Sequence, residues 1–137
     1  MYPEHIFVDT GALFALADKD DSHHKEATLI FPSLLKTYKG LITSNLVIAE
    51  SYILILKNLG HTAAIKFLER IGSSPRIIRI YSTPDTEAKA EKILKKYQDQ
   101  DFSYTDAVSF VIMKMHRIKK SFSFDKHFST MGFTGLP

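Results

Sequence analysis

Apolar residues occur along this chain in two patterns, short runs that are continuous or alternate with polar residues, and longer stretches with helical spacing. The runs lie at residues 5–8, 41–43, 77–81 and 120–124, with a weaker one at 133–136. Short runs rich in Ile, Val and Phe predict buried strands. Between them, apolar residues recur three and four positions apart, which predicts helices over residues 11–17, 23–38, 45–59, 61–71, 84–97, 103–116 and 125–129.

Local signals mark several of the predicted helix ends. Thr83 followed by Pro84 is a strong start, because Thr caps a helix and Pro suits its first position. Gly60 and Gly72 are expected to end the helices before them, since glycine is the usual residue just beyond a helix.

The alternation of strands and helices predicts an α/β fold. Its central sheet is expected to be mostly parallel, with four or five strands and helices on both faces. The length of 137 residues fits one domain, residues 1–137, and there is no repeat or linker. Ligands of such sheets bind at the carboxyl ends of the strands, so functional residues are sought there.

Four carboxylates lie where this edge would gather them. Asp9 and Asp125 follow the first and fourth predicted strands. Glu50 and Asp106 lie early in two helices whose starts point to the same edge. Ionised carboxylates on largely buried elements are unfavourable unless a cation pairs with them, and no single cation of this sequence is an evident partner for all four. A divalent ion is the economical explanation, and ligands that are all oxygen suit Mg²⁺ or Mn²⁺.

Each acid also has an ordinary structural explanation. Asp9 and Asp125 can cap the helices that follow them, and Asp106 is the acid of a capping box that begins at Ser103. Glu50 is the hardest to explain in this way, because its apolar neighbours leave little room for a solvated face.

Two further residues are candidates for accessory roles. Asp101, in the loop before the 103–116 helix, is a candidate ligand of a metal or its water. His127 is a candidate either for packing beside Phe128 or for contact with a substrate.

Composition narrows the function classes. The chain has no Cys, which removes disulfides, thiolate metal sites and cysteine nucleophiles and fits a reducing compartment. No apolar run reaches membrane-spanning length, and residues 1–5 lack a basic signal-peptide start, so we expect a cytoplasmic protein without membrane association. The formal net charge of +3 is mild. An acidic cluster inside a basic protein implies an acidic pocket on a positive surface, and that surface would attract a polyanion toward a metal.

Four segments resemble, in order, the acidic blocks of the PIN-domain ribonucleases, and more narrowly of the VapC-type toxins of toxin–antitoxin pairs. They are Val8-Asp9-Thr10, the apolar helix with Glu50, residues 101–110, and residues 122–128 followed by Met131-Gly132-Phe133. The resemblance covers nearly the full chain, and its two C-terminal blocks are the most specific.

The resemblance implies a three-layer α/β/α Rossmann-like fold and a metal-dependent endoribonuclease. Asp9, Glu50, Asp106 and Asp125 fall on the family's acidic quartet, Thr10 on the hydroxyl residue after the first acid, and Asp101 where many relatives carry another acid. It also implies an RNA substrate, a cognate antitoxin and frequent homodimerisation, for which the apolar helix at 46–59 is the candidate surface.

The expected reaction is hydrolysis of an RNA phosphodiester by water that Mg²⁺ or Mn²⁺ activates. Asp9 and Asp106 are the expected principal ligands, while Glu50 and Asp125 complete the shell, hold a second ion or orient water. The closing residues 134–137 make a poor strand, so the last strand of the fold is in doubt.

Two other enzyme or signalling classes place an Asp after the first strand, but this sequence fits them poorly. A haloacid dehalogenase-type phosphatase requires a second Asp two positions after Asp9, where Gly11 stands. A receiver domain requires an Asp after the third strand, where residues 81–84 read Tyr-Ser-Thr-Pro. Two alternatives stay open: a PIN-like RNA-binding or protein-interaction module with little or no catalysis, and an RNA-processing nuclease without an antitoxin.

Overall fold

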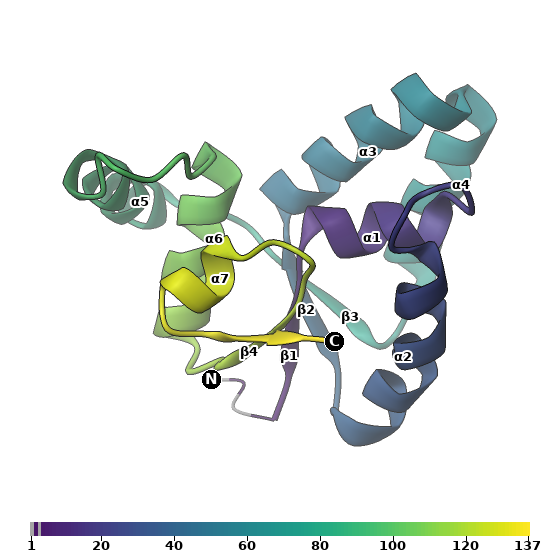
Figure 1. Ribbon diagram of the computed structural model, residues 1–137, viewed down its shortest axis with the longest axis horizontal. Coiled ribbons are helices and arrows are strands. Elements are labelled where there is room, and N and C mark those ends of the chain that lie inside the picture. Colours follow the sequence, from purple (N-terminus) through teal and green to yellow (C-terminus); the bar gives the residue numbers. More distant parts are fainter. Residues whose placement is uncertain (1, 3) are drawn as a thin grey trace.

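Five short strands form one parallel sheet in the order β3-β2-β1-β4-β5 (Figure 1). The computed structural model describes residues 2 and 4–137; Met1 and Pro3, part of the stretch where no signal peptide is expected, lie outside the described residues. The strands are β1 (Ile6–Val8), β2 (Leu41–Ser44), β3 (Ile77–Ile80), β4 (Lys120–Phe122) and β5 (Thr134–Leu136).

Helices cover both faces of this sheet, which confirms the expected α/β/α layers (Figure 1). On one side lie α1 (Thr10–Ala17), α2 (His24–Thr37), α3 (Asn45–Leu59) and α4 (His61–Ser73). On the other lie α5 (Pro84–Lys96), α6 (Tyr104–Met115) and the short α7 (His127–Thr130). Among the described residues, no helix is long and apolar enough to cross a membrane.

The core lies between the sheet and these two helical layers. All three residues of β1 are buried, as expected for a central strand whose two faces are both covered. On the α6 side, Phe7 of β1 packs against Phe128 of α7, and Phe128 meets Phe110 of α6 edge to face at 5.1 Å between ring centroids. These contacts fix α6 and α7 against β1, the strand that Asp9 follows.

Most predicted boundaries agree with the structure. Thr83 caps α5 by accepting a hydrogen bond from the Thr86 amide, and Gly60 ends α3 with a φ of 95°, a conformation that favours glycine. The expectation for Gly72 is wrong: α4 continues to Ser73, because Gly72 is not among the residues with positive φ and so stays helical.

The largest differences concern the C-terminal segment. β4 ends at Phe122 instead of residue 124, and α7 begins at His127 instead of residue 125. The chain turns between them because the Ser123 hydroxyl accepts a hydrogen bond from the Asp125 amide at 3.0 Å. The last strand does form: β5 pairs with β4 in parallel, with Phe122 opposite Leu136.

Candidate active site

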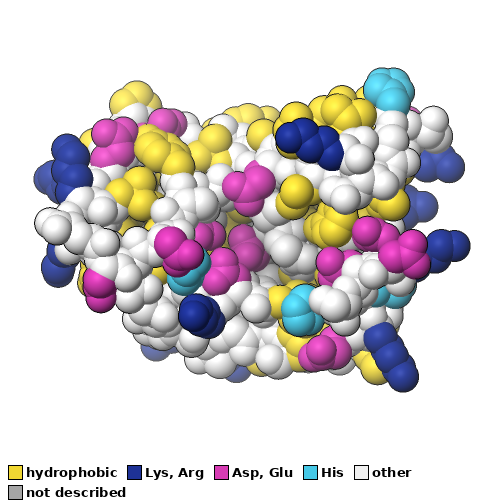
Figure 2. All heavy atoms as spheres, turned by 45° about the horizontal axis from the view of Figure 1, so that its top comes forward, with side chains coloured by type: hydrophobic (Ala, Val, Ile, Leu, Met, Phe, Trp, Pro, Cys, Tyr) yellow, Lys and Arg dark blue, Asp and Glu magenta, His cyan; other side chains and the backbone are white. Residues whose placement is uncertain are grey.

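A hollow of about 390 Å³ lies at the carboxyl ends of the central strands. It is lined by Asp9, Thr10, Gly11, Glu50, Leu54, Ser103, Asp106, Phe124 and Asp125. Figure 2 shows acidic side chains gathered around a hollow in the middle of this face, with most of the Lys and Arg side chains in view toward its margins. The structure thus brings all four acids of the predicted quartet to one cavity.

Asp9 is the most deeply buried of these acids, with 5% of its surface exposed. It follows β1 directly and precedes the first turn of α1, but its carboxylate makes no helix-capping hydrogen bond. The pKa of Asp9 is raised from the usual 3.8 to about 7. Burial is the main cause and the nearby Asp106 and Asp125 carboxylates add to it, while hydrogen bonds from the Thr10 amide and the Ser123 hydroxyl oppose the rise. A cation at this place would remove the unfavourable burial of charge.

Asp106 is fixed by the N-terminus of α6. Its Oδ2 atom accepts a hydrogen bond from the Ser103 amide at 3.0 Å, and the Ser103 hydroxyl accepts one from the Asp106 amide at 2.9 Å, which completes the predicted capping box. Burial and the Asp125 carboxylate raise the pKa of Asp106, while the Ser103 amide and His127 oppose the rise. The capping role and a role in the site are therefore compatible.

Asp125 is held by the turn between β4 and α7. Its Oδ1 atom accepts a hydrogen bond from the His127 amide at 2.9 Å. The hydroxyl of Ser123 donates to Asp9 Oδ2 at 3.2 Å and accepts from the Asp125 amide, so one side chain links the acids that follow β1 and β4. Sequence reasoning missed Ser123; its only signal is a hydroxyl between the strand and the acid.

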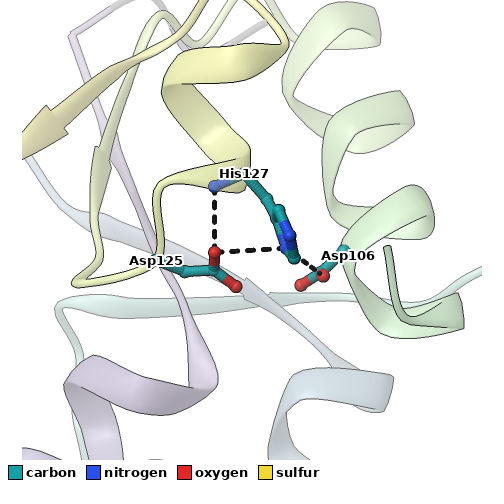
Figure 3. Close-up of side chains that lie close together, drawn as sticks. All are labelled: Asp106, Asp125 and His127. Carbon is teal, nitrogen blue, oxygen red and sulfur yellow. Dashed lines mark hydrogen bonds and ion pairs between the residues drawn. The ribbon is translucent and has the colours of Figure 1, made fainter. Parts of the chain in front are cut away.

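The ring of His127 lies between carboxylates (Figure 3). Its Nδ1 atom is 3.2 Å from Asp106 Oδ2 and 3.1 Å from Asp125 Oδ1, and its Nε2 atom is 2.7 Å from Asp101 Oδ1. Burial lowers the pKa of His127, but the three carboxylates outweigh it and the net pKa is raised. The same contact with His127 lowers the pKa of Asp101.

The remaining predicted residues differ in how directly they belong to the cavity. Glu50 lies on α3, whose N-terminus is capped by Ser44, and lines the cavity. Its side chain is only half-buried, so the expectation that Glu50 has little solvated surface is too strong. Thr10 also lines the cavity, and its hydroxyl is buried without a hydrogen-bond partner among the described residues. Asp101 lies outside the cavity lining, its side chain 93% exposed.

These groups fit a hard divalent cation. The cavity offers carboxylate oxygens from several elements and the Thr10 hydroxyl, which has no partner among the described residues, and its lining contains neither Cys nor Met. Such a donor set suits Mg²⁺ or Mn²⁺. One ligand atom each from Asp106, Asp125 and His127 lie within 4.8 Å of one another, so His127 also has to be considered as a ligand.

A second cavity does not offer comparable chemistry. It measures about 720 Å³ and lies between α5, α6 and the segment after α7. Lys89, Lys92, Lys96 and Lys114 are the charged residues that line it, among apolar side chains. This lining contains no carboxylate or imidazole, the groups that would hold a hard divalent cation.

Comparisons with known proteins agree with the geometry. Residues 6–134 match the PIN domain family. The 23S rRNA-specific endonuclease VapC20 of Mycobacterium tuberculosis (strain H37Rv) is 32% identical over 129 residues, which cover 93% of this chain and 95% of that protein. A VapC ribonuclease of Archaeoglobus fulgidus is 32% identical over 124 residues, covering 89% of this chain and 78% of that protein.

Solved structures extend this likeness to three dimensions. The crystal structure of Mycobacterium tuberculosis VapC20, a sarcin–ricin loop cleaving toxin, matches with a TM-score of 0.87 at 31% identity over 94% of this chain and 96% of that one. FitAcB from Neisseria gonorrhoeae matches with a TM-score of 0.65 at 16% identity over 96% of each chain, which shows a shared fold. The chain belongs to the PIN-domain family and, within it, to the VapC ribonucleases.

Proposed function

We propose that this VapC-type nuclease is a divalent-metal-dependent endoribonuclease whose ion is held by Asp9, Glu50, Asp106 and Asp125. The observation that carries the proposal is the buried Asp9 carboxylate, which lies close to two other acids at one cavity. Within the described part of the chain, no cationic side chain forms a hydrogen bond with Asp9. When bound, Mg²⁺ or Mn²⁺ supplies a Lewis acid that activates water and stabilises charge on a phosphate.

The protein's own residues have separable roles in this reaction. Asp9 and Asp106 present carboxylates from a strand end and a helix start, so their positions are set by the rigid part of the fold. Thr10 lines the cavity, and its buried hydroxyl has no hydrogen-bond partner among the described residues, which leaves it for a hydrogen bond to a phosphate oxygen or a water. Ser123 positions the acids, since its hydroxyl donates to Asp9 and accepts from the Asp125 amide.

Ribosomal RNA is the substrate to test first. The relative VapC20 is named as a 23S rRNA-specific endonuclease, and it aligns with 93% of this chain. The test is incubation of purified protein with total RNA in Mn²⁺ or Mg²⁺, followed by sequencing of the new 5′ ends, beside EDTA and Asp9→Asn controls. Discrete ends in 23S rRNA that vanish in both controls support the proposal. Discrete ends in another RNA would support the proposed activity but show that the substrate is that RNA.

The alternative of an RNA-binding or protein-interaction module makes the opposite prediction. In that case RNA binding, measured by gel shift, survives EDTA and the Asp9→Asn change, and no new ends arise in any RNA. An RNA-processing nuclease without an antitoxin would show cleavage but no inhibitory partner. Family membership favours a protein antitoxin, whose addition is expected to suppress the new ends.

We also propose a homodimer formed through the exposed part of α3. Ile53 and Leu59 on this helix are 45% and 39% exposed, and burial of such side chains against a second copy is favourable. Sedimentation of the Ile53→Lys variant is expected to shift a dimer toward the monomer. The Leu29→Lys variant changes an even more exposed leucine, 72% accessible on α2, and is expected to leave the dimer intact. A wild-type protein that sediments only as a monomer contradicts this proposal.

A further inference from the structure

The side chain of His127 is held in one orientation by contacts on all sides. Its two ring nitrogens face Asp101, Asp106 and Asp125 at 2.7 to 3.2 Å. The ring of Phe102 meets it edge to face at 5.1 Å between centroids, and only 12% of the His127 side chain is exposed. A ring fixed in this way can in turn fix the orientation of the carboxylates that it contacts.

The contacts divide the oxygens of the two site carboxylates into two groups. Asp106 Oδ2 faces the His127 ring and accepts from the Ser103 amide. Asp125 Oδ1 faces the ring and accepts from the His127 amide. The other oxygen of each carboxylate has no hydrogen bond within the part of the chain that the structure describes. Figure 3 shows the second oxygen of each carboxylate turned away from the ring. Both acids line the cavity whereas His127 does not, so this second oxygen is left for the cavity.

The ring nitrogens are poorly placed to be metal ligands themselves. Each nitrogen lies within hydrogen-bond distance of a carboxylate oxygen, Nδ1 facing Asp106 and Asp125 and Nε2 facing Asp101. Both nitrogens are therefore directed at groups of the protein, and His127 is not among the residues that line the cavity. Residues behind metal ligands commonly orient them through such hydrogen bonds.

We propose that His127 is a positioning residue: it holds one carboxylate oxygen of Asp106 and one of Asp125, so that the second oxygen of each acid is directed at the divalent ion. Asp101 fixes the His127 ring from the solvent side. This inference rests on the metal site of the proposed function. It assigns Asp101 a role through His127, in place of the direct metal or water ligand expected from the sequence.

The experiment titrates the full chain with Mn²⁺ and measures binding as the loss of the EPR signal of the free ion. His127→Ala is expected to weaken binding about 10- to 100-fold, the usual effect of losing such a partner. His127→Asn, whose amide nitrogen can replace Nδ1, is expected to recover much of this loss. Binding by His127→Ala as tight as the wild type, or tighter, would overturn the proposal.

The role of Asp101 is tested in the same assay. Asp101→Asn is expected to weaken Mn²⁺ binding a few-fold in the wild type, and to have no effect in the His127→Ala background, because it acts only through the ring. The matched control is Asp99→Asn, which removes the same charge from the same exposed loop. An equal effect of Asp101→Asn in both backgrounds would show that Asp101 acts on the metal independently, and would contradict the proposal.

A spectroscopic measurement separates positioning from direct ligation. Pulsed EPR of the Mn²⁺-bound wild type is expected to show no coupling from a directly bound ¹⁴N nucleus. Such a coupling, lost in His127→Ala, would make His127 a ligand and overturn the proposal. Absence of Mn²⁺ binding by the wild type would instead refute the metal site of the proposed function, and this inference with it.

Discussion

Burial of Asp9 is the residue-scale feature on which the proposed chemistry depends. A carboxylate that is 5% exposed and whose pKa is raised to about 7 is unfavourable in its ionised form. In the unfolded chain the same group titrates near its usual value of about 3.9. The folded state therefore binds more protons between these two values, and the contribution of Asp9 to stability falls as the pH rises through this window.

Removing this charge is expected to stabilise the metal-free protein at pH 8. A pKa near 7 for Asp9 corresponds to at most about 4 kcal/mol, so Asp9→Asn should raise the free energy of unfolding by about 1–3 kcal/mol in EDTA. The gain should be smaller at pH 5, where Asp9 of the folded wild type is largely protonated. Urea unfolding at both pH values measures it, with Asp99→Asn as the control; a variant less stable than the wild type at pH 8 would contradict the assignment.

A bound ion is expected to offset the unfavourable burial of the Asp9 charge. Saturating Mn²⁺ should raise the melting temperature of the wild type more at pH 8 than at pH 5, because protons compete with the metal for Asp9 at the lower pH. Asp9→Asn should show little of this rise at either pH. Differential scanning calorimetry with and without Mn²⁺ tests this, and an equal rise in wild type and variant would place the ion elsewhere.

Residue chemistry was only partly predictable from the sequence. The four acids are recognisable because each follows a strand or begins a helix, where side chains reach the sheet edge. The role of Ser123 was not recognisable from the sequence. Its hydrogen bonds to Asp9 and the Asp125 amide depend on a turn that begins two residues earlier than the apolar run suggests.

At the scale of elements, the N-terminus of α6 combines helix capping with the site. Ser103 caps the helix and its amide holds Asp106 Oδ2, so the local motif and the proposed ligand share one set of hydrogen bonds. The sequence predicted this element well, because the capping box is a local signal that needs no tertiary information.

The two capped helices of the α5–α6 layer allow a matched comparison. Ser103→Ala and Thr83→Ala each remove one side-chain cap and should each lower the free energy of unfolding by about 1 kcal/mol. Only Ser103→Ala should also weaken Mn²⁺ binding and RNA cleavage, since Thr83 lies outside the cavity lining. Equal losses of cleavage in both variants would mean that stability alone accounts for the effect.

At the scale of the whole molecule, strand order explains how distant residues meet. Because β4 pairs with β1 in parallel, Ser123 reaches Asp9 across 114 positions of sequence. The sequence predicted a common edge but not this order, which is set by long-range pairing. All five strands belong to one sheet. A single domain over residues 1–137 stays a prediction, which one cooperative unfolding transition would support.

The central claim is that four carboxylates act together on RNA through a divalent ion, and variant cleavage rates test it most directly. Asp9→Asn, Glu50→Gln, Asp106→Asn and Asp125→Asn would be compared with the exposed controls Asp99→Asn and Glu69→Gln in Mn²⁺. Loss of one of several groups that act as a unit costs nearly as much as loss of all. We predict that each quartet variant loses at least about 100-fold in cleavage rate while both controls stay within about twofold, consistent with the cost of removing groups that stabilise charge in a transition state. Full activity in any folded quartet variant would contradict the account.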